Sequence, residues 1–196
     1  SLMKSISKNN NYSKDELEII HYGLEAIYLL VTKLVIITAI AYLLGIFYEF
    51  VIFLLIYNII RLPSFGLHAT KSWICLVAST IMFIVCPIIA TNIYFNPIIR
   101  SIIGCFCIWR IYKNAPADTE KRPIINKKRR LAYKYISTFT TIAMVIVSLI
   151  SNDMFIANSF VLAPLLQTFM ISPYVYKLFG LKYNNYLNYL NTSTVS

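Results

Sequence analysis

Charge is scarce in this sequence, and acidic charge is the scarcest. Only 13% of the 196 residues are charged, and just eight residues are Asp or Glu. With 58% hydrophobic residues and a mean hydropathy of +0.66, the composition excludes a soluble globular domain. It excludes a disordered chain as well, because 15 Tyr and 12 Phe leave too much apolar surface for a solvated chain. The composition therefore predicts an all-α integral membrane protein.

Cysteine and histidine are also few. The four cysteines lie within or at the edge of apolar stretches, so we expect free thiols rather than disulfides. Cys105 and Cys107 have no second pair, which does not match a zinc site, and we predict no metal and no cofactor. Of the two histidines, His21 lies in the N-terminal region, where a surface contact is the simplest interpretation. His68 lies in a more unusual setting.

Six hydrophobic stretches approach the roughly 20 residues needed to cross a bilayer. Residues 15–28, before the first of them, show the pattern of an amphipathic interfacial helix. Several prolines fall inside the stretches, which membrane helices tolerate. We therefore predict six transmembrane helices in a single domain, 1–196. The predicted spans are 26–44, 46–60, 72–90, 93–112, 135–151 and 154–174.

Positive charge is concentrated in one loop. Between Arg110 and Lys134 there are nine basic and two acidic residues, which gives +7 of the chain's net +10. Because Lys and Arg in short loops stay cytoplasmic, we place a basic loop at 113–134 and both termini in the cytoplasm. An interfacial segment at 1–25 and a cytoplasmic tail at 175–196 complete the domain. This location of the charge argues against a nucleic-acid partner.

The second predicted span ends in a stretch unlike the other turns. Arg61-Leu62-Pro63-Ser64-Phe65-Gly66 brings together a charge, a helix breaker and a flexible residue, and should stop the helix near Ile60. We expect irregular or re-entrant backbone between the second and third spans. Such backbone must line protein or water rather than lipid, so we also expect a small pocket that faces the cytoplasm.

His68 and Cys75 are the candidate catalytic pair. A nucleophilic thiol needs a base or a cation that keeps it as a thiolate, and the start of a helix near Ser72 would add the positive end of a helix dipole. In one continuous helix the pair would lie about 10.5 Å apart along the axis, too far for proton transfer. The pair can act only if residues 63–71 fold His68 back toward Cys75. The alternative is a space-filling cysteine and a histidine that bonds loop carbonyls.

Two blocks of sequence carry a resemblance to a known family. The stretch Arg61-Leu62-Pro63-Ser64-Phe65-Gly66-Leu67-His68-Ala69, followed by Cys75, resembles the signature of the AgrB family. Asn114-Ala115-Pro116-Ala117-Asp118, Pro123-Ile124 and the basic run 127–130 are similar to that family's cytoplasmic loop. The likeness spans most of the chain. One departure is Phe65, because many family members have two adjacent glycines at this place.

The resemblance implies a function and a location. The family consists of multi-pass endopeptidases of the bacterial cell membrane that process AgrD, the precursor of an autoinducing peptide in quorum sensing. It implies that Cys75 attacks a carbonyl of an AgrD-like precursor, that His68 handles the proton, and that the resulting thioester is closed to a thiolactone. It also implies a homodimer. Because the family's precursor has an acidic C-terminal part, we name five basic residues as candidate substrate-binding residues: Arg61, Lys127, Lys128, Arg129 and Arg130.

Other readings of the same features stay open. The chain could instead be a non-enzymatic component of a small-peptide transporter or exporter, with Arg100 inside a span, or a scaffold that binds membrane lipids through its basic loop. The basic loop is explained equally well as a topology anchor. For a third group that orients His68, the sequence offers only polar candidates: Ser64, Ser72 and Gln167.

Overall fold

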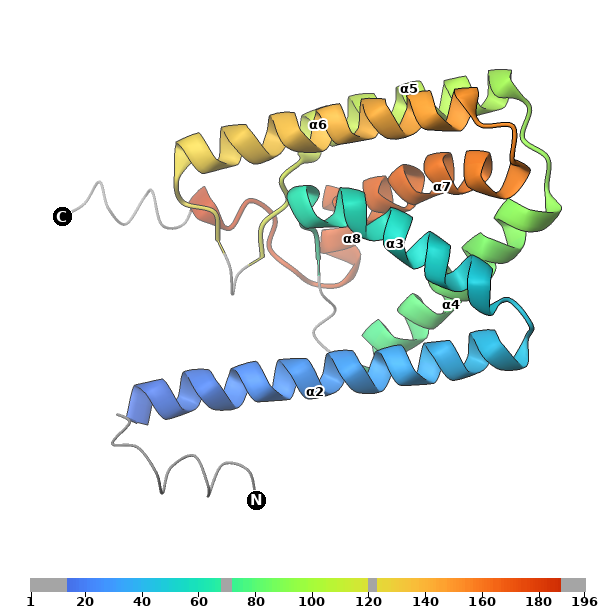
Figure 1. The fold of residues 1–196 in the computed structure, drawn as a ribbon. Helices are drawn as coiled ribbons and strands as arrows, with labels where there is room; N and C mark the ends of the chain where they lie inside the picture. The colour runs from blue at the N-terminus through green and yellow to red at the C-terminus, as the bar shows by residue number, and fades with distance from the viewer. Residues whose placement is uncertain (1–13, 68–71, 120–122, 188–196) are drawn as a thin grey trace.

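The computed structural model describes residues 14–67, 72–119 and 123–187, and this part of the chain forms seven helices (Figure 1). The described residues form no β-strand, and an isolated parallel bridge joins Phe65 and Ala117. The predicted all-α class is therefore confirmed. The helices are α2 (Lys14–Leu43), α3 (Phe47–Ser64), α4 (Ser72–Asn92), α5 (Pro97–Asn114), α6 (Lys127–Ile150), α7 (Met154–Met170) and α8 (Pro173–Leu178).

The distribution of polar and apolar side chains is consistent with a membrane protein. Helices α3 and α6 are long and apolar enough to cross a membrane, and shorter apolar helices cover Leu30–Leu43, Leu76–Asn92 and Met154–Met170. Large apolar side chains such as Ile98 and Ile150 are more than 70% exposed, whereas many polar side chains are buried. A surface that is this apolar around polar interior groups is stable only when something other than water covers it.

Helix α7 forms the centre of the bundle. It packs against α3, α4, α5 and α6, and ten of its 17 residues are buried. Helices α5 and α6 lie side by side along one side of α7, while α3 and α4 lie along the other (Figure 1). Helix α2 lies at the edge, where Ile37 and Ala41 pack against Phe50 of α3 and Ile84 of α4. The predicted interfacial helix and first span form this one continuous helix.

Each of the other five predicted spans overlaps a helix, but several predicted ends are wrong because capping residues decide them. Pro97 does not lie inside α5 but begins it, after Asn96, whose side chain accepts a hydrogen bond from the Ile99 amide. Helix α6 begins at Lys127, inside the predicted basic loop, where the Asn126 side chain provides the cap. Pro173 likewise starts the separate helix α8 instead of continuing α7.

The stretch 61–66 does end the helix, as predicted, but four residues after the predicted span end at Ile60. Helix α3 continues through Pro63 to Ser64, and only then does the backbone change direction. Phe65 and Gly66 have φ values of 57° and 120°, both in the left-handed region. The expected irregular backbone after the second span is therefore confirmed, and it begins at Phe65.

Candidate active site

The two sequence blocks singled out above meet in the structure. The Gly66 amide donates a hydrogen bond to the Ala117 carbonyl (3.0 Å), and the Ala117 amide donates to the Ser64 carbonyl (3.1 Å). These two bonds form the parallel bridge between the end of α3 and the segment that follows α5. Segments about fifty residues apart in the sequence are thus fixed against each other by backbone hydrogen bonds.

Arg61 binds the backbone that leads to His68. Its guanidinium donates to the carbonyl oxygens of Phe65 (2.7 Å), Gly66 (3.4 Å) and Leu67 (2.9 Å). These carbonyls follow the end of α3 and so lack helical partners, and a planar fork of N–H donors can meet all three. The predicted role of Arg61 in binding substrate stays a prediction, since in the structure its guanidinium bonds the connector.

Gln167 of α7 fixes the same connector from the other side. Its side-chain amide donates to the Ser64 hydroxyl (2.6 Å) and to the Phe65 carbonyl (2.7 Å), and its oxygen accepts from the Tyr57 hydroxyl (3.0 Å). Ser64 and Gln167 were both polar candidates in the sequence. Tyr57 was missed, although Tyr57, Arg61 and Ser64 follow one another at helical spacing and so share a face of α3.

Gly66 lies where no side chain fits. A Cβ atom there would collide with the Arg61 guanidinium and would lie 3.2 Å from the Met170 carbonyl oxygen. The same carbonyl accepts the Leu67 amide (3.3 Å), so the connector also touches the end of α7. The glycine therefore provides both a positive φ and the space for the Arg61 contacts.

Helix α8 and the segment after it contact the second block at Ala117 and Asp118. The buried Asp118 carboxylate accepts hydrogen bonds from the backbone amides of Asn185 (3.0 Å) and Tyr186 (2.9 Å). The Tyr176 hydroxyl donates to the carbonyls of Ala117 and Asp118. Burial raises the pKa of Tyr176 well above its usual range. Sequence patterns gave no sign of these contacts, because nothing local links the tail to the loop.

A pocket lies beside this connector, as expected, while the prediction that it faces the cytoplasm stays a prediction. It has a volume of about 380 Å³ and joins Phe65 of the first block to residues of the second block. The Phe65 ring meets the Tyr133 ring edge to face, with 4.9 Å between the centroids. The wall is apolar and aromatic, with one guanidinium, from Arg129. The remaining lining residues are Pro123, Ile124, Ile125 and Asn126.

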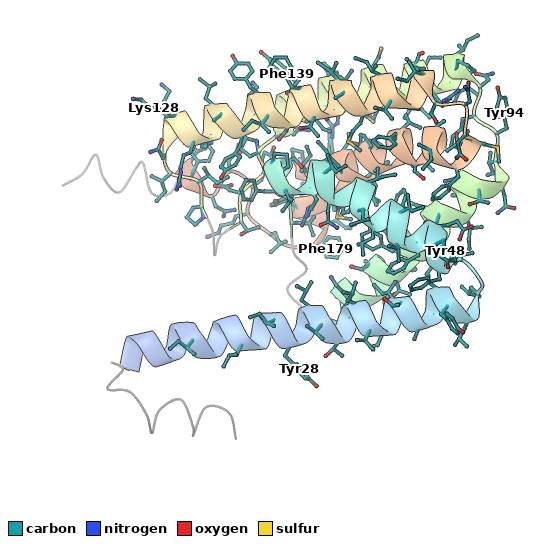
Figure 2. The ribbon with its side chains drawn as sticks, viewed as in Figure 1. Tyr28, Tyr48, Tyr94, Lys128, Phe139 and Phe179 are labelled. Atoms are coloured by element: carbon teal, nitrogen blue, oxygen red, sulfur yellow. The ribbon has the colours of Figure 1, made fainter. Side chains whose placement is uncertain are left out.

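The four basic substrate-binding candidates of the second block form the first turn of α6. They have different surroundings. Arg129 lines the pocket, and the Arg130 guanidinium lies 3.1 Å from the centre of the Tyr186 ring. Lys127 and Lys128 are exposed, and Lys128 marks the end of the bundle at which the site lies (Figure 2). Four positive charges at the positive end of a helix oppose its dipole, so this turn is a strong attractor for anions.

The side chains of the candidate catalytic pair are not among those that the structure describes. His68 lies outside the described residues, immediately after Leu67, and Ser72 begins α4. Cys75 is the fourth residue of α4, which puts its backbone in the first turn, while its side chain lies outside the description. Cys86, Cys105 and Cys107 are free thiols, as expected. Among the described residues, no three His, Cys, Asp or Glu side chains gather in a way that could hold a metal ion.

Comparison with known proteins identifies the family. The model of the AgrB family, accessory gene regulator B, matches residues 1–171. The chain belongs to the AgrB family. An AgrB-like protein of Clostridium acetobutylicum is 28% identical over 192 residues, which cover 96% of this chain and 91% of that protein. An AgrB-like protein of Listeria innocua is 34% identical, with 87% and 83% covered.

The accessory gene regulator protein B of Staphylococcus aureus is 31% identical over 152 residues, which cover 76% of this chain and 79% of that protein. No solved structure shows a significant match. Membership of the AgrB family supports a role in quorum sensing and implies association with an agr system and an AgrD-type peptide. The predicted homodimer stays a prediction.

Proposed function

We propose that this AgrB-family chain is a membrane-embedded cysteine endopeptidase that cleaves an AgrD-like precursor peptide. The supporting observation is the connector at residues 65–67, which Arg61 and Gln167 bind from two sides next to an apolar pocket. Such a connector would hold in place the backbone that directly precedes His68. Helix α4 then begins only a few residues later and carries Cys75 in its first turn.

The proposed reaction is an acyl transfer to sulfur. The Cys75 thiolate attacks the carbonyl carbon of the scissile bond, and the C–S bond forms as the C–N bond breaks. His68 takes the thiol proton and passes it to the leaving amine. A cysteine thiol of the precursor can then attack the thioester carbonyl, which closes a thiolactone as the bond to Cys75 breaks and its thiol is released. Attack by a hydroxyl would give a lactone, and attack by water a linear peptide.

The surroundings of the pocket fit a peptide with an apolar residue near an acidic tail. Its aromatic wall of Phe65 and Tyr133 would accept an apolar side chain of the precursor. Arg129 at the pocket, with Lys127 and Lys128 beside it, would attract the acidic part. Together they would present the intervening peptide bond to the connector that leads to His68.

The decisive experiment compares precursor cleavage by variants of the two candidate catalytic residues. We expect co-expression of the chain with its precursor to give a shortened peptide by mass spectrometry. Cys75→Ala and His68→Ala should each abolish it, because each removes a group that the bond-breaking step requires. Cys86→Ala, at a free thiol in α4 distant from the first turn, should leave cleavage intact.

Two results would contradict the proposal. Cleavage that survives Cys75→Ala would exclude the thioester route. A precursor whose mass stays unchanged with the wild-type chain, but which still leaves the cell in a chain-dependent way, would favour the transporter interpretation.

A further inference from the structure

A second pocket lies at the end of the bundle opposite to the candidate active site. Its volume is about 290 Å³, and it is formed by the start of α5, the end of α6, the start of α7, and the segments before α5 and before α7. Tyr94, one of its lining residues, marks this end, whereas Lys128 marks the other (Figure 2). In the predicted topology this end lies on the side of the membrane that faces away from the cytoplasm. The proposed peptidase function makes no use of this pocket.

The central feature of this pocket is a buried positive charge. Arg100, in the first turn of α5, lines the pocket and is only 6% exposed. Its Nη1 donates to the Ser148 carbonyl oxygen, and its Nε is buried without a hydrogen-bond partner. Among the described residues no carboxylate forms an ion pair with Arg100. Asp153 is nearby in the fold, but its carboxylate caps α7 through the Ile156 amide.

A buried guanidinium without a counter-ion is costly, and in membrane proteins such residues usually mark a binding site. The remaining electrostatics of the pocket also favour an anion. Helices α5 and α7 both begin here, at Pro97 and Met154, so two positive helix ends flank the guanidinium. The Asn158 side chain is neutral, and its amide donates to the carbonyls of Ala90 and Ile93.

The surroundings identify the kind of anion. Leu149 and Met154 line the pocket and are 37–38% exposed, which provides an apolar surface for acyl chains. Tyr94, also exposed, is of the residue type that gathers at the level of lipid head groups. A guanidinium pairs well with the oxygens of a phosphate, because its N–H donors match their geometry.

We propose that this pocket binds the phosphate of an anionic phospholipid through Arg100. The lipid supplies the counter-charge that the chain lacks, and its tails cover the neighbouring apolar surface. Inorganic phosphate offers the same chemistry without the tails, so it is the second source that the test must separate.

The test measures lipid retention by native mass spectrometry of the full chain, released from nanodiscs of mixed phosphatidylglycerol and phosphatidylcholine. We expect Arg100→Gln to lower the apparent affinity for phosphatidylglycerol by about tenfold or more. Lys113→Gln is the matched control, because it removes one charge from the far end of the same helix, where Lys113 is exposed. It should bind like the wild type.

A second variant leaves Arg100 in place. Asn152 is an exposed lining residue, so Asn152→Asp should fold normally and repel an anion from the pocket. Reduced phosphatidylglycerol binding by both variants supports the proposal. Wild-type binding by both variants overturns it. Arg100-dependent binding of inorganic phosphate, measured in neutral detergent, together with Arg100-independent lipid binding, would overturn the lipid as the source of the phosphate.

Discussion

At the scale of single residues, Arg61 and Gly66 form one unit. The guanidinium reaches three successive carbonyls only because residue 66 has no side chain. Gln167 adds a second hydrogen bond to the Phe65 carbonyl, so the connector is bound from both α3 and α7. Under the proposed function, fixing this connector would position His68, which follows Leu67 in the sequence.

Gly66→Ala tests this unit. The added Cβ should displace the Arg61 guanidinium, and the positive φ adds backbone strain of about 1–3 kcal/mol. We expect precursor cleavage to fall by on the order of 100-fold, because a small displacement of a catalytic group has that effect. Gly45→Ala is the control, since Gly45 has a similar positive φ of 72° but nothing within 4 Å of the new Cβ. Equal cleavage loss in both variants would contradict the steric explanation.

The site could be predicted from the sequence only as far as its local signals reach. Arg61, Gly66 and the block around Asp118 carry spacing and residue types that single them out. Tyr176 and Asn185 carry none, because their partners lie about sixty residues away and are brought near by tertiary packing alone. The bond between Gln167 and Ser64 had the same obstacle, so the sequence offered two polar residues without their geometry.

At the scale of elements, the first turn of α6 combines a good cap with an unfavourable charge pattern. Asn126 accepts hydrogen bonds from the Lys128 and Arg129 amides, which starts the helix inside the basic run. Hydropathy located the apolar part of this helix but not its beginning, because a basic turn lowers hydropathy without disfavouring helix. Around Pro97 and Pro173 the error has the opposite cause, because apolar residues continue up to the point at which each proline begins a new helix.

Lys127→Gln combined with Lys128→Gln should separate the two roles of this turn. Each lysine opposes the helix dipole by about 0.3–1 kcal/mol, so the double variant should be at least as stable as the wild type. Precursor cleavage should nevertheless weaken, and more at low salt than at high salt, because salt screens charge attraction. Cleavage assays at two ionic strengths provide the measurement. An equal loss at both would argue for misfolding rather than lost attraction.

At the scale of the whole molecule, the bundle depends on close packing around α7 and between α5 and α6. Gly104 of α5 lies against Val145 of α6, and a Cβ at residue 104 would be 2.7 Å from the valine Cγ1. Small residues allow helices in membranes to approach each other in this way. Apolar side chains on the outside of the bundle do not favour the compact arrangement, because lipid covers them equally well when the helices lie further apart.

Gly104→Ala should therefore destabilise the bundle by about 1–3 kcal/mol, which is typical of an overpacked interior. Gly23→Ala is a matched control in α2, where nothing lies within 4 Å of the new Cβ. That variant should be neutral or gain about 0.5–1 kcal/mol, because alanine favours helix over glycine. Thermal unfolding in detergent distinguishes the two. A Gly104→Ala variant as stable as the wild type would show that α5 and α6 can move apart enough to accommodate the methyl group without a loss of stability.

The packing of the tail on Asp118 affects how the chain can be shortened or labelled. The family match ends at residue 171, yet the amides that meet the Asp118 carboxylate belong to Asn185 and Tyr186. A gene fragment cut to the matched length would leave this buried acid with only the longer hydrogen bond from the Ile124 amide (3.4 Å). Purification tags and fluorescent fusions are best joined beyond residue 187, through a flexible spacer. The amides of Asn185 and Tyr186 then keep their hydrogen bonds to the Asp118 carboxylate.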